Sequence, residues 1–313
     1  MPVSATETLR VFVLNVGQAD TALIVTPSGH VAVIDAVNPG KIINLLADLG
    51  LAKGEQVDHL ILTHPHEDHY SGAARLLNEY DVRDVVLSSF EPYTGTAGYH
   101  AIINQIEGKG IPCLFVPSHN TLYLDGALAA AKDRVTVDLV GPSQAIINGL
   151  DRLGQLNPNH LSLIARVTFG DFTMVLAADA QMENWQHFDE EGMMRSTHVV
   201  KAAHHGSRHG TQAERLERLE AKYVVVSSDP DGRHSLPDLI GAATLFVVGS
   251  KQSVACLTRD SGTVEVNAGS NGSYKVLHYG EDAENTVPLG AAKQLSRDSN
   301  PTDWAKLVRS RLG

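Results

Sequence analysis

The sequence predicts an α/β layered fold, on three observations. Short apolar runs bounded by turn residues alternate with segments of helical periodicity along most of the chain. Of the 313 residues, 43% are hydrophobic and 19% are charged, which is the balance of a globular protein. Strands first follow one another and then alternate with helices, and this order is typical of layered α/β domains.

Three strands are expected in the first third of the chain. Each is a short apolar run, and the turns between them are "GQAD" and "PSGH". The runs cover residues 11–16, 21–26 and 31–36. The following "PGKIINLLADLG" predicts a helix that opens near Pro39 and closes at Gly50, because its apolar residues lie three and four apart.

The alternation of strands and helices then continues. We expect a buried strand in "HLILTH" (59–64), a helix in "HYSGAARLLNEY" (69–80) and a strand in "DVVLSS" (84–89). "SLIARVTFG" and "FTMVLAADA" predict a hairpin that turns at Gly170-Asp171, since such a pair favours a two-residue turn.

The second half of the chain repeats this pattern. "STHVVKAAHH" (196–205) and "YVVVSS" (223–228) predict strands, with a helix between them from about Thr211. "SVACLTRDSGTVEV" (253–266) predicts a further hairpin. Beyond it the composition becomes polar, which sets the expected domain boundary.

One domain is expected over residues 1–282, followed by a polar tail over residues 283–313 with a short helix in "TDWAKLVRSRL". No apolar stretch approaches the roughly 18 residues of a membrane span. The N-terminal segment lacks the basic and apolar regions of a signal peptide. Cys113 and Cys256 have neither disulfide-framework nor metal-type spacing, so a reducing cytoplasm is the expected compartment.

The net charge of -11 argues against binding of extended duplex nucleic acid, which depends on neutralising many phosphates. A local positive site remains compatible with this charge if metal ions form it. The composition predicts no particular oligomeric state.

The stretch "LTHPHEDHYSG" (62–72) places three histidines and two carboxylates within six positions. His64 ends an apolar strand, and residues two apart in a strand point the same way, so His64 and His66 can reach one point. Asp68 and His69 lie where the next helix begins and can close on a second point nearby. Imidazole and carboxylate are ligands of borderline divalent metals. A solvated, histidine-rich loop is the alternative, but this spacing favours a metal site.

"THPHEDH" resembles the signature of the metallo-β-lactamase superfamily. "LNVGQADTALI", "HHGS" (204–207) and "LTRDSGTVEV" resemble motifs in the C-terminal hydrolase domain of ComEC-type competence proteins and their stand-alone relatives. Asn15 and Ala19 stand where that group often has aspartate and glycine. The resemblance covers roughly residues 9–280. It implies an αββα sandwich, with two mixed sheets flanked by helices and two metal ions at one edge of the sheets.

The same resemblance implies a ligand set. It assigns His64 and His66 to the first metal, and Asp68 and His69 to the second. The remaining implied ligands are Asp179 in "LAADA" as the carboxylate that bridges both metals, His205 at the second metal, and His160 as the third ligand of the first metal, with the neighbouring Asn159 as its alternative.

His204 and His205 are adjacent at an expected strand end, so they should not both face one metal if the strand continues. We therefore assign His204 to the substrate, as a hydrogen-bond donor. Gly206 and Ser207 could bring a backbone N–H and a hydroxyl close to an anion.

Three further residues have weaker assignments. Asp35, in "VIDA", could hold the metal loop or orient a ligand imidazole, and an ordinary strand-end aspartate is the alternative. Lys201 is expected to be a surface charge. His234, in the loop at 227–238, is a candidate substrate contact.

These residues predict a dinuclear metal-dependent hydrolase. Zinc is the expected metal, with manganese and iron as alternatives. Two metals would lower the pKa of a shared water, with Asp68 or Asp179 orienting it and His204 facing the developing negative charge. The resemblance favours a phosphodiester, in nucleic acid or in a smaller ester.

Two other functions remain open. The same ligands would serve hydrolysis of a lactone, lactam, thioester or other carbon-centred ester. A non-catalytic, metal-stabilised regulatory module is the second alternative.

Overall fold

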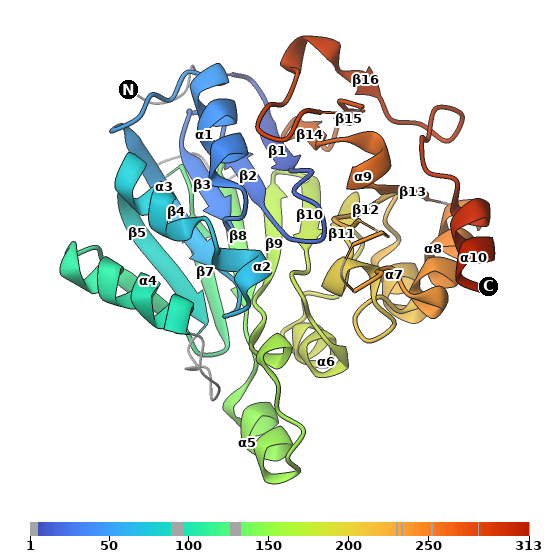
Figure 1. Cartoon of the computed structure of the whole chain (residues 1–313), viewed down its shortest axis with the longest axis horizontal. Helices are drawn as coiled ribbons and strands as arrows, with labels where there is room; N and C mark the ends of the chain where they lie inside the picture. The colour runs from blue at the N-terminus through green and yellow to red at the C-terminus, as the bar shows by residue number, and fades with distance from the viewer. Residues whose placement is uncertain are drawn as a thin grey trace.

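The structure is a computed structural model that describes residues 6–88, 97–125, 133–229, 231–232, 234–251, 253–280 and 282–312. Two mixed sheets face each other, and helices cover both outer faces (Figure 1). The αββα sandwich predicted from the sequence is confirmed.

Among the described residues the larger sheet has nine strands in the order β16-β15-β14-β1-β2-β3-β4-β5-β6. Within this sheet, neighbouring strands from β16 to β3 pair antiparallel, and neighbouring strands from β3 to β6 pair parallel. The strands are β1 (Leu9–Val13), β2 (Ala22–Val25), β3 (Val31–Ile34), β4 (Gln56–Leu62), β5 (Asp81–Ser88), β6 (Cys113–Val116), β14 (Val264–Ala268), β15 (Tyr274–His278) and β16 (Lys293–Gln294).

The smaller sheet has seven strands within the described ranges, in the order β13-β12-β11-β10-β9-β8-β7. Its strands from β10 to β13 are parallel, and those from β7 to β10 are antiparallel. The strands are β7 (His119–Tyr123), β8 (Val135–Val140), β9 (Ile164–Phe169), β10 (Phe172–Leu176), β11 (Val199–Lys201), β12 (Tyr223–Val226) and β13 (Val254–Leu257).

The helices divide between the two outer faces. Figure 1 shows α1, α3 and α4 on the side of the larger sheet, and α6, α7, α8 and α10 on the side of the smaller one. The α-helices are α1 (Pro39–Asp48), α2 (Glu67–Tyr70), α3 (Ala73–Glu79), α4 (Ala97–Gly108), α5 (Gln144–Arg152), α6 (Met182–Glu190), α7 (Ala213–Leu219), α8 (Leu239–Lys251), α9 (Thr258–Ser261) and α10 (Trp304–Leu312). Short 3-10 helices cover Pro158–Leu161, Ala203–Gly206 and Leu289–Ala291.

Three apolar layers hold this arrangement together, and the two-residue period of strands explains their separation. In β1, Phe12 packs with the helices over the larger sheet, while Val11 and Val13 pack between the sheets. The third layer joins the smaller sheet to its helices through residues such as Trp185 and Leu245.

Most strands expected from the sequence are present, but the helix expected at residues 69–80 is split into α2 and α3. The break lies at Gly72, whose N–H donates to the carbonyl of Ala36 at 2.7 Å. A Cβ at Gly72 would lie 2.8 Å from Cδ of Pro39. Close packing against the start of α1 therefore interrupts the helix.

The hairpin expected at residues 253–266 is wrong. β13 belongs to the smaller sheet, whereas β14 pairs with β1 in the larger one. The short helix α9 and Gly262, whose φ is +69°, connect the strand in one sheet to the strand in the other. The apolar pattern is the same for a hairpin and for this crossing, because both strands are buried.

The segment after Asp282 packs against the domain. It contains the expected short helix, α10, which lies beside α8. Val287, Leu295 and Trp304 are buried among the core residues. The division at residue 282 stays a prediction. In the described part of the chain, no helix combines the length and apolar character that crossing a membrane requires.

Candidate metal centre

The candidate site lies where parallel strands of both sheets end. Asp35 follows β3 and His64 follows β4, while Asp179 follows β10 and the pair His204-His205 follows β11. The carboxyl ends of parallel strands meet at one edge, which is where ligands bind in open α/β sheets.

Asp35 organises the loop that carries the first histidines. One of its oxygens accepts a hydrogen bond from the backbone N–H of Thr63 at 2.8 Å. The other lies 2.7 Å from Nδ1 of His69. Because this contact holds Nδ1, Nε2 of His69 faces the site. Partners of metal-binding histidines commonly fix the orientation of the ring in this way. Asp35 thus orients a histidine of the cluster.

His64, His66 and Asp179 form one group whose atoms could hold a metal ion. Nε2 of His64 lies 3.1 Å from Nδ1 of His66 and 3.9 Å from Oδ2 of Asp179. His64 is fully buried, and burial, followed by the charge of His69, lowers its pKa well below the usual value. A neutral imidazole is the form that binds a metal.

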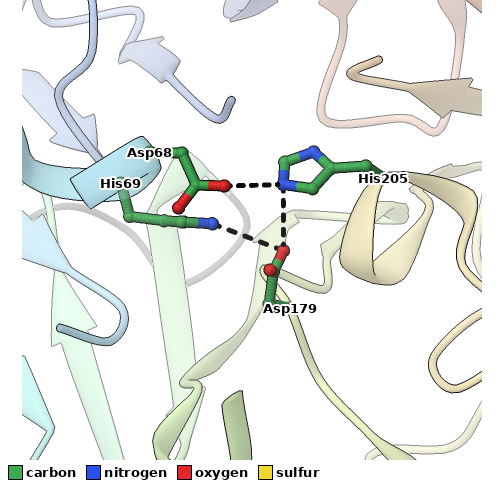
Figure 2. A group of neighbouring side chains, drawn as sticks. All are labelled: Asp68, His69, Asp179 and His205. Atoms are coloured by element: carbon green, nitrogen blue, oxygen red, sulfur yellow. Dashed lines mark ion pairs between the residues drawn. The ribbon is translucent and has the colours of Figure 1, made fainter. Parts of the chain in front are cut away.

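A second group joins Asp68, His69, Asp179 and His205 (Figure 2). Oδ1 of Asp179 lies 3.3 Å from Nε2 of His69 and 3.4 Å from Nε2 of His205. These three atoms are buried and have no hydrogen-bond partner among the described residues. Ligand atoms about 2.0–2.1 Å from a tetrahedral ion lie about 3.4 Å from one another. The orphaned atoms therefore fit a divalent cation.

The charges in this group favour a cation. Burial would raise the pKa of Asp179, but His205 and His69 hold it well below the usual value. Burial opposes protonation of His69, yet Asp35 and Asp179 raise its pKa well above normal. Burial would raise the pKa of Asp68, but the contact with His205 and the charge of His69 outweigh it and lower the pKa. The carboxylates thus concentrate negative charge where a metal would bind.

The histidine pair does not continue strand β11, which ends at Lys201. His204 and His205 have φ of 49° and 51°, so both are left-handed. The expectation that neighbouring residues of a strand face opposite sides therefore does not apply to this pair. Nε2 of His204 lies 3.7 Å from Asp179, and Nε2 of His205 lies 3.4 Å from Asp179. His204 is the more exposed of the two and also lies 3.4 Å from Nδ2 of Asn159.

The structure places His160 outside both groups. Its Nδ1 accepts a hydrogen bond from the backbone N–H of Asn157, and its Nε2 lies 3.4 Å from Oε2 of Glu183. The 3-10 turn that begins at Pro158 directs the neighbouring Asn159 toward His204 instead. Asn159, the alternative considered from the sequence, occupies the place next to the site.

A cavity of about 560 Å³ opens over the two groups. Asn159, Ser207 and His234 line it, as do Arg208 and Asp238. Gly206 is not part of the lining; it packs at φ +81° beneath Pro237. The cavity is large enough for a small ester beside the metal-binding atoms.

Two charged residues beneath the site were missed or misjudged from the sequence. Lys201 is not a surface charge: it is 3% exposed and forms an ion pair with Asp20, which is 5% exposed. A lysine in the apolar run "HVVKAA" could have signalled a buried partner, since lysine is rarely buried unless paired.

The family model for the metallo-beta-lactamase superfamily matches residues 14–228. The chain belongs to this superfamily. The matched residues include both candidate metal groups and the left-handed histidine pair.

The chain is also similar to ComE operon protein 3 of Bacillus subtilis, with 24% identity over 187 residues. That match covers 59% of this chain and 22% of the relative, so the chain spans about a fifth of its length. CmlA, a diiron beta-hydroxylase from Streptomyces venezuelae, aligns with a TM-score of 0.51 and 18% identity, over 82% of this chain and 53% of its own. The metallo-beta-lactamase fold protein YhfI from Bacillus subtilis aligns with a TM-score of 0.49 and 13% identity, over 83% of this chain and 100% of its own.

Proposed function

We propose that the protein is a dinuclear metal-dependent hydrolase whose preferred substrates are phosphodiesters. The observation that carries the proposal is the convergence of Nε2 of His69, Nε2 of His205 and Oδ1 of Asp179, which are buried and have no hydrogen-bond partner among the described residues. A buried polar atom without a partner is costly, so such a cluster needs a compensating ligand.

Two cations would be held by residues from both sheets. His64 and His66 would bind the first cation. The second cation would be bound by Asp68, His69 and His205. Asp179 would bind both cations, since it belongs to both groups. When bound, the cations supply Lewis acidity and a water molecule whose pKa is lowered. The set of imidazoles and carboxylates suits zinc and manganese, and the diiron neighbour CmlA adds iron to the metals to be tested.

The protein's own groups would position the reaction. Asp68 is partly exposed to the cavity, and its Oδ2 lies 3.5 Å from Nε2 of His205. It can orient a water molecule and accept a proton at this oxygen. His204 lines the same cavity, and its imidazole can donate a hydrogen bond to a developing oxyanion.

Two observations favour phosphodiesters over carbon-centred esters. The rim of the cavity carries Arg208, His209 and His234, which can approach an anionic substrate. Arg208 donates its backbone N–H and its Nε to Asp238, and its terminal guanidinium nitrogens have no hydrogen-bond partner among the described residues.

The test is hydrolysis of bis(p-nitrophenyl) phosphate with added zinc, manganese or iron, beside a lactone and a lactam. We expect phosphodiester turnover that is lost in the His64→Ala, His66→Ala double variant. His160→Ala is the matched control, because this nearby histidine lies outside both groups. Equal rates for wild type and the double variant would contradict the proposal, and turnover of only the lactone or lactam would overturn the substrate class.

A further inference from the structure

The buried ion pair between Asp20 and Lys201 connects the segments that carry three candidate ligands. The backbone N–H of Asp20 donates to the carbonyl of Asp68 at 3.0 Å. Nζ of Lys201 donates to the carbonyl of Ala178 at 3.2 Å, next to Asp179. The pair therefore ties the loop of the larger sheet to the turn of the smaller one.

Asp20 also lies on the Nδ1 side of the His205 imidazole. Its Oδ1 lies 3.7 Å from Nδ1 of His205, which donates to the carbonyl of Ser227 at 2.7 Å. Oδ1 is buried and has no hydrogen-bond partner among the described residues. Asp20 thus places negative charge on the side of the imidazole opposite to the candidate metal, in the way that outer partners tune a ligand.

The space around the pair excludes a direct role with substrate. Asp20 and Lys201 line a cavity of about 20 Å³ together with Asp35 and Thr63. This volume suffices for a single water molecule. Neither residue lines the larger cavity that opens over the metal groups. The pair therefore does not contact a substrate in the larger cavity, and its effect on the site acts through its charge and through the segments that it joins.

We propose that Asp20 and Lys201 are positioning residues for the metal centre. Their ion pair holds the segments of Asp68, Asp179 and His205 in register, and Asp20 neutralises an ammonium that would otherwise repel the bound cations. Like charges in a low-dielectric interior repel strongly, so the two halves of the pair have unequal effects. This inference rests on the proposed binding of two cations.

The chain offers a matched control in a second buried lysine–aspartate pair. Nζ of Lys41 lies 3.2 Å from Oδ2 of Asp282, and their side chains are 2% and 0% exposed. Nζ of Lys41 also donates to the carbonyl of Asn15 at 2.7 Å. Neither Lys41 nor Asp282 belongs to the described metal-binding groups. Lys41→Met therefore reports what loss of such a pair does to stability alone.

The experiment is a titration of the metal-free full chain with Co²⁺, followed by visible absorption, in wild type, Asp20→Asn, the double variant Asp20→Asn, Lys201→Met, and Lys41→Met. We expect Asp20→Asn to weaken Co²⁺ binding about 10- to 100-fold. The double variant should recover part of this loss because the uncompensated ammonium is gone. Lys41→Met should lower the melting temperature and keep wild-type affinity and spectrum.

Wild-type affinity and spectrum in folded Asp20→Asn would overturn the inference, and so would an equal loss of affinity in Lys41→Met. If Asp20→Asn does not fold, the double variant decides: a weaker affinity and an altered Co²⁺ spectrum support the inference, and wild-type values contradict it. Failure of the wild-type protein to bind Co²⁺ would instead overturn the proposed function, and this inference with it.

Discussion

The two halves of the candidate metal centre are built in different ways. In the larger sheet, the histidines and Asp68 lie within residues 63–69, and His66 has ordinary extended backbone. In the smaller sheet, the groups come from two separate turns, and Ala178, His204 and His205 all have positive φ. The candidate ligands of the first half form a local motif, although Asp35, which orients His69, also has a positive φ of 56°. The ligands of the second half depend on two separate turns that the surrounding fold must hold.

Such conformations cost of order 1–3 kcal/mol each and persist only where the surroundings determine them. Around the histidine pair, Thr211 donates its hydroxyl to the carbonyl of Ala203, and Trp185 donates its indole N–H to the carbonyl of Gly210. Both donors are buried. Packing of α6 and the loop before α7 therefore maintains the second half.

The largest expected effect concerns Asp179, which belongs to both halves. Asp179→Asn keeps the size of the side chain and removes its negative charge, so both cations should bind more weakly. We expect activity to fall by more than the roughly 100-fold that loss of an outer partner costs. Metal analysis after dialysis measures the loss directly. Retention of both cations would show that Asp179 does not bridge the two halves.

A smaller effect separates backbone strain from close packing in the second half. Gly206 has φ +81°, and a Cβ there would lie 2.7 Å from Cγ of Pro237. Gly50 has φ +96°, but a Cβ there would meet no described atom within 4 Å. We expect Gly50→Ala to cost about 1 kcal/mol. Gly206→Ala should cost about 1–3 kcal/mol more.

Denaturant unfolding of both glycine variants measures these costs, and Co²⁺ titration shows whether the site changes. Only Gly206→Ala should weaken metal binding, since Gly206 directly follows His205. Similar unfolding free energies and unchanged metal binding in both variants would indicate that the turn around the histidine pair tolerates distortion.

The smallest effect distinguishes the neighbours Asn159 and His160. Asn159→Ala removes a contact with His204 and should lower kcat/KM about tenfold, the equivalent of about 1.4 kcal/mol. His160→Ala removes the partner of the Asn157 N–H and should cost about 1 kcal/mol of stability with no loss of metal. Kinetics and metal content of the two variants test this. Loss of a cation in His160→Ala would reverse the roles of the two residues.

The first half of the site could be predicted from sequence because its residues are adjacent and alternate along one strand end. His204 and His205 were found as a motif, but their geometry could not be predicted, because a strand rule fails once the backbone turns left-handed. The buried pair of Asp20 and Lys201 joins residues 181 positions apart, and only the folded chain brings them together.

The fold shows the same division between local and long-range information. The hairpin at Gly170-Asp171 was predicted because its turn and both strands are local. The chain from Val254 to Val266 was misread, since membership of one sheet or the other depends on pairing with β1 far away in the sequence. Local patterns identified the strands, and tertiary pairing decided where they belong.

The most direct test of two cations shared by the two halves is anomalous X-ray diffraction from crystals of the Co²⁺-loaded protein. We predict two anomalous peaks flanking Asp179, one beside His64 and His66 and the other beside Asp68, His69 and His205. Crystals with no peak at Asp179, or with a single peak that only one half of the site contacts, would contradict the account.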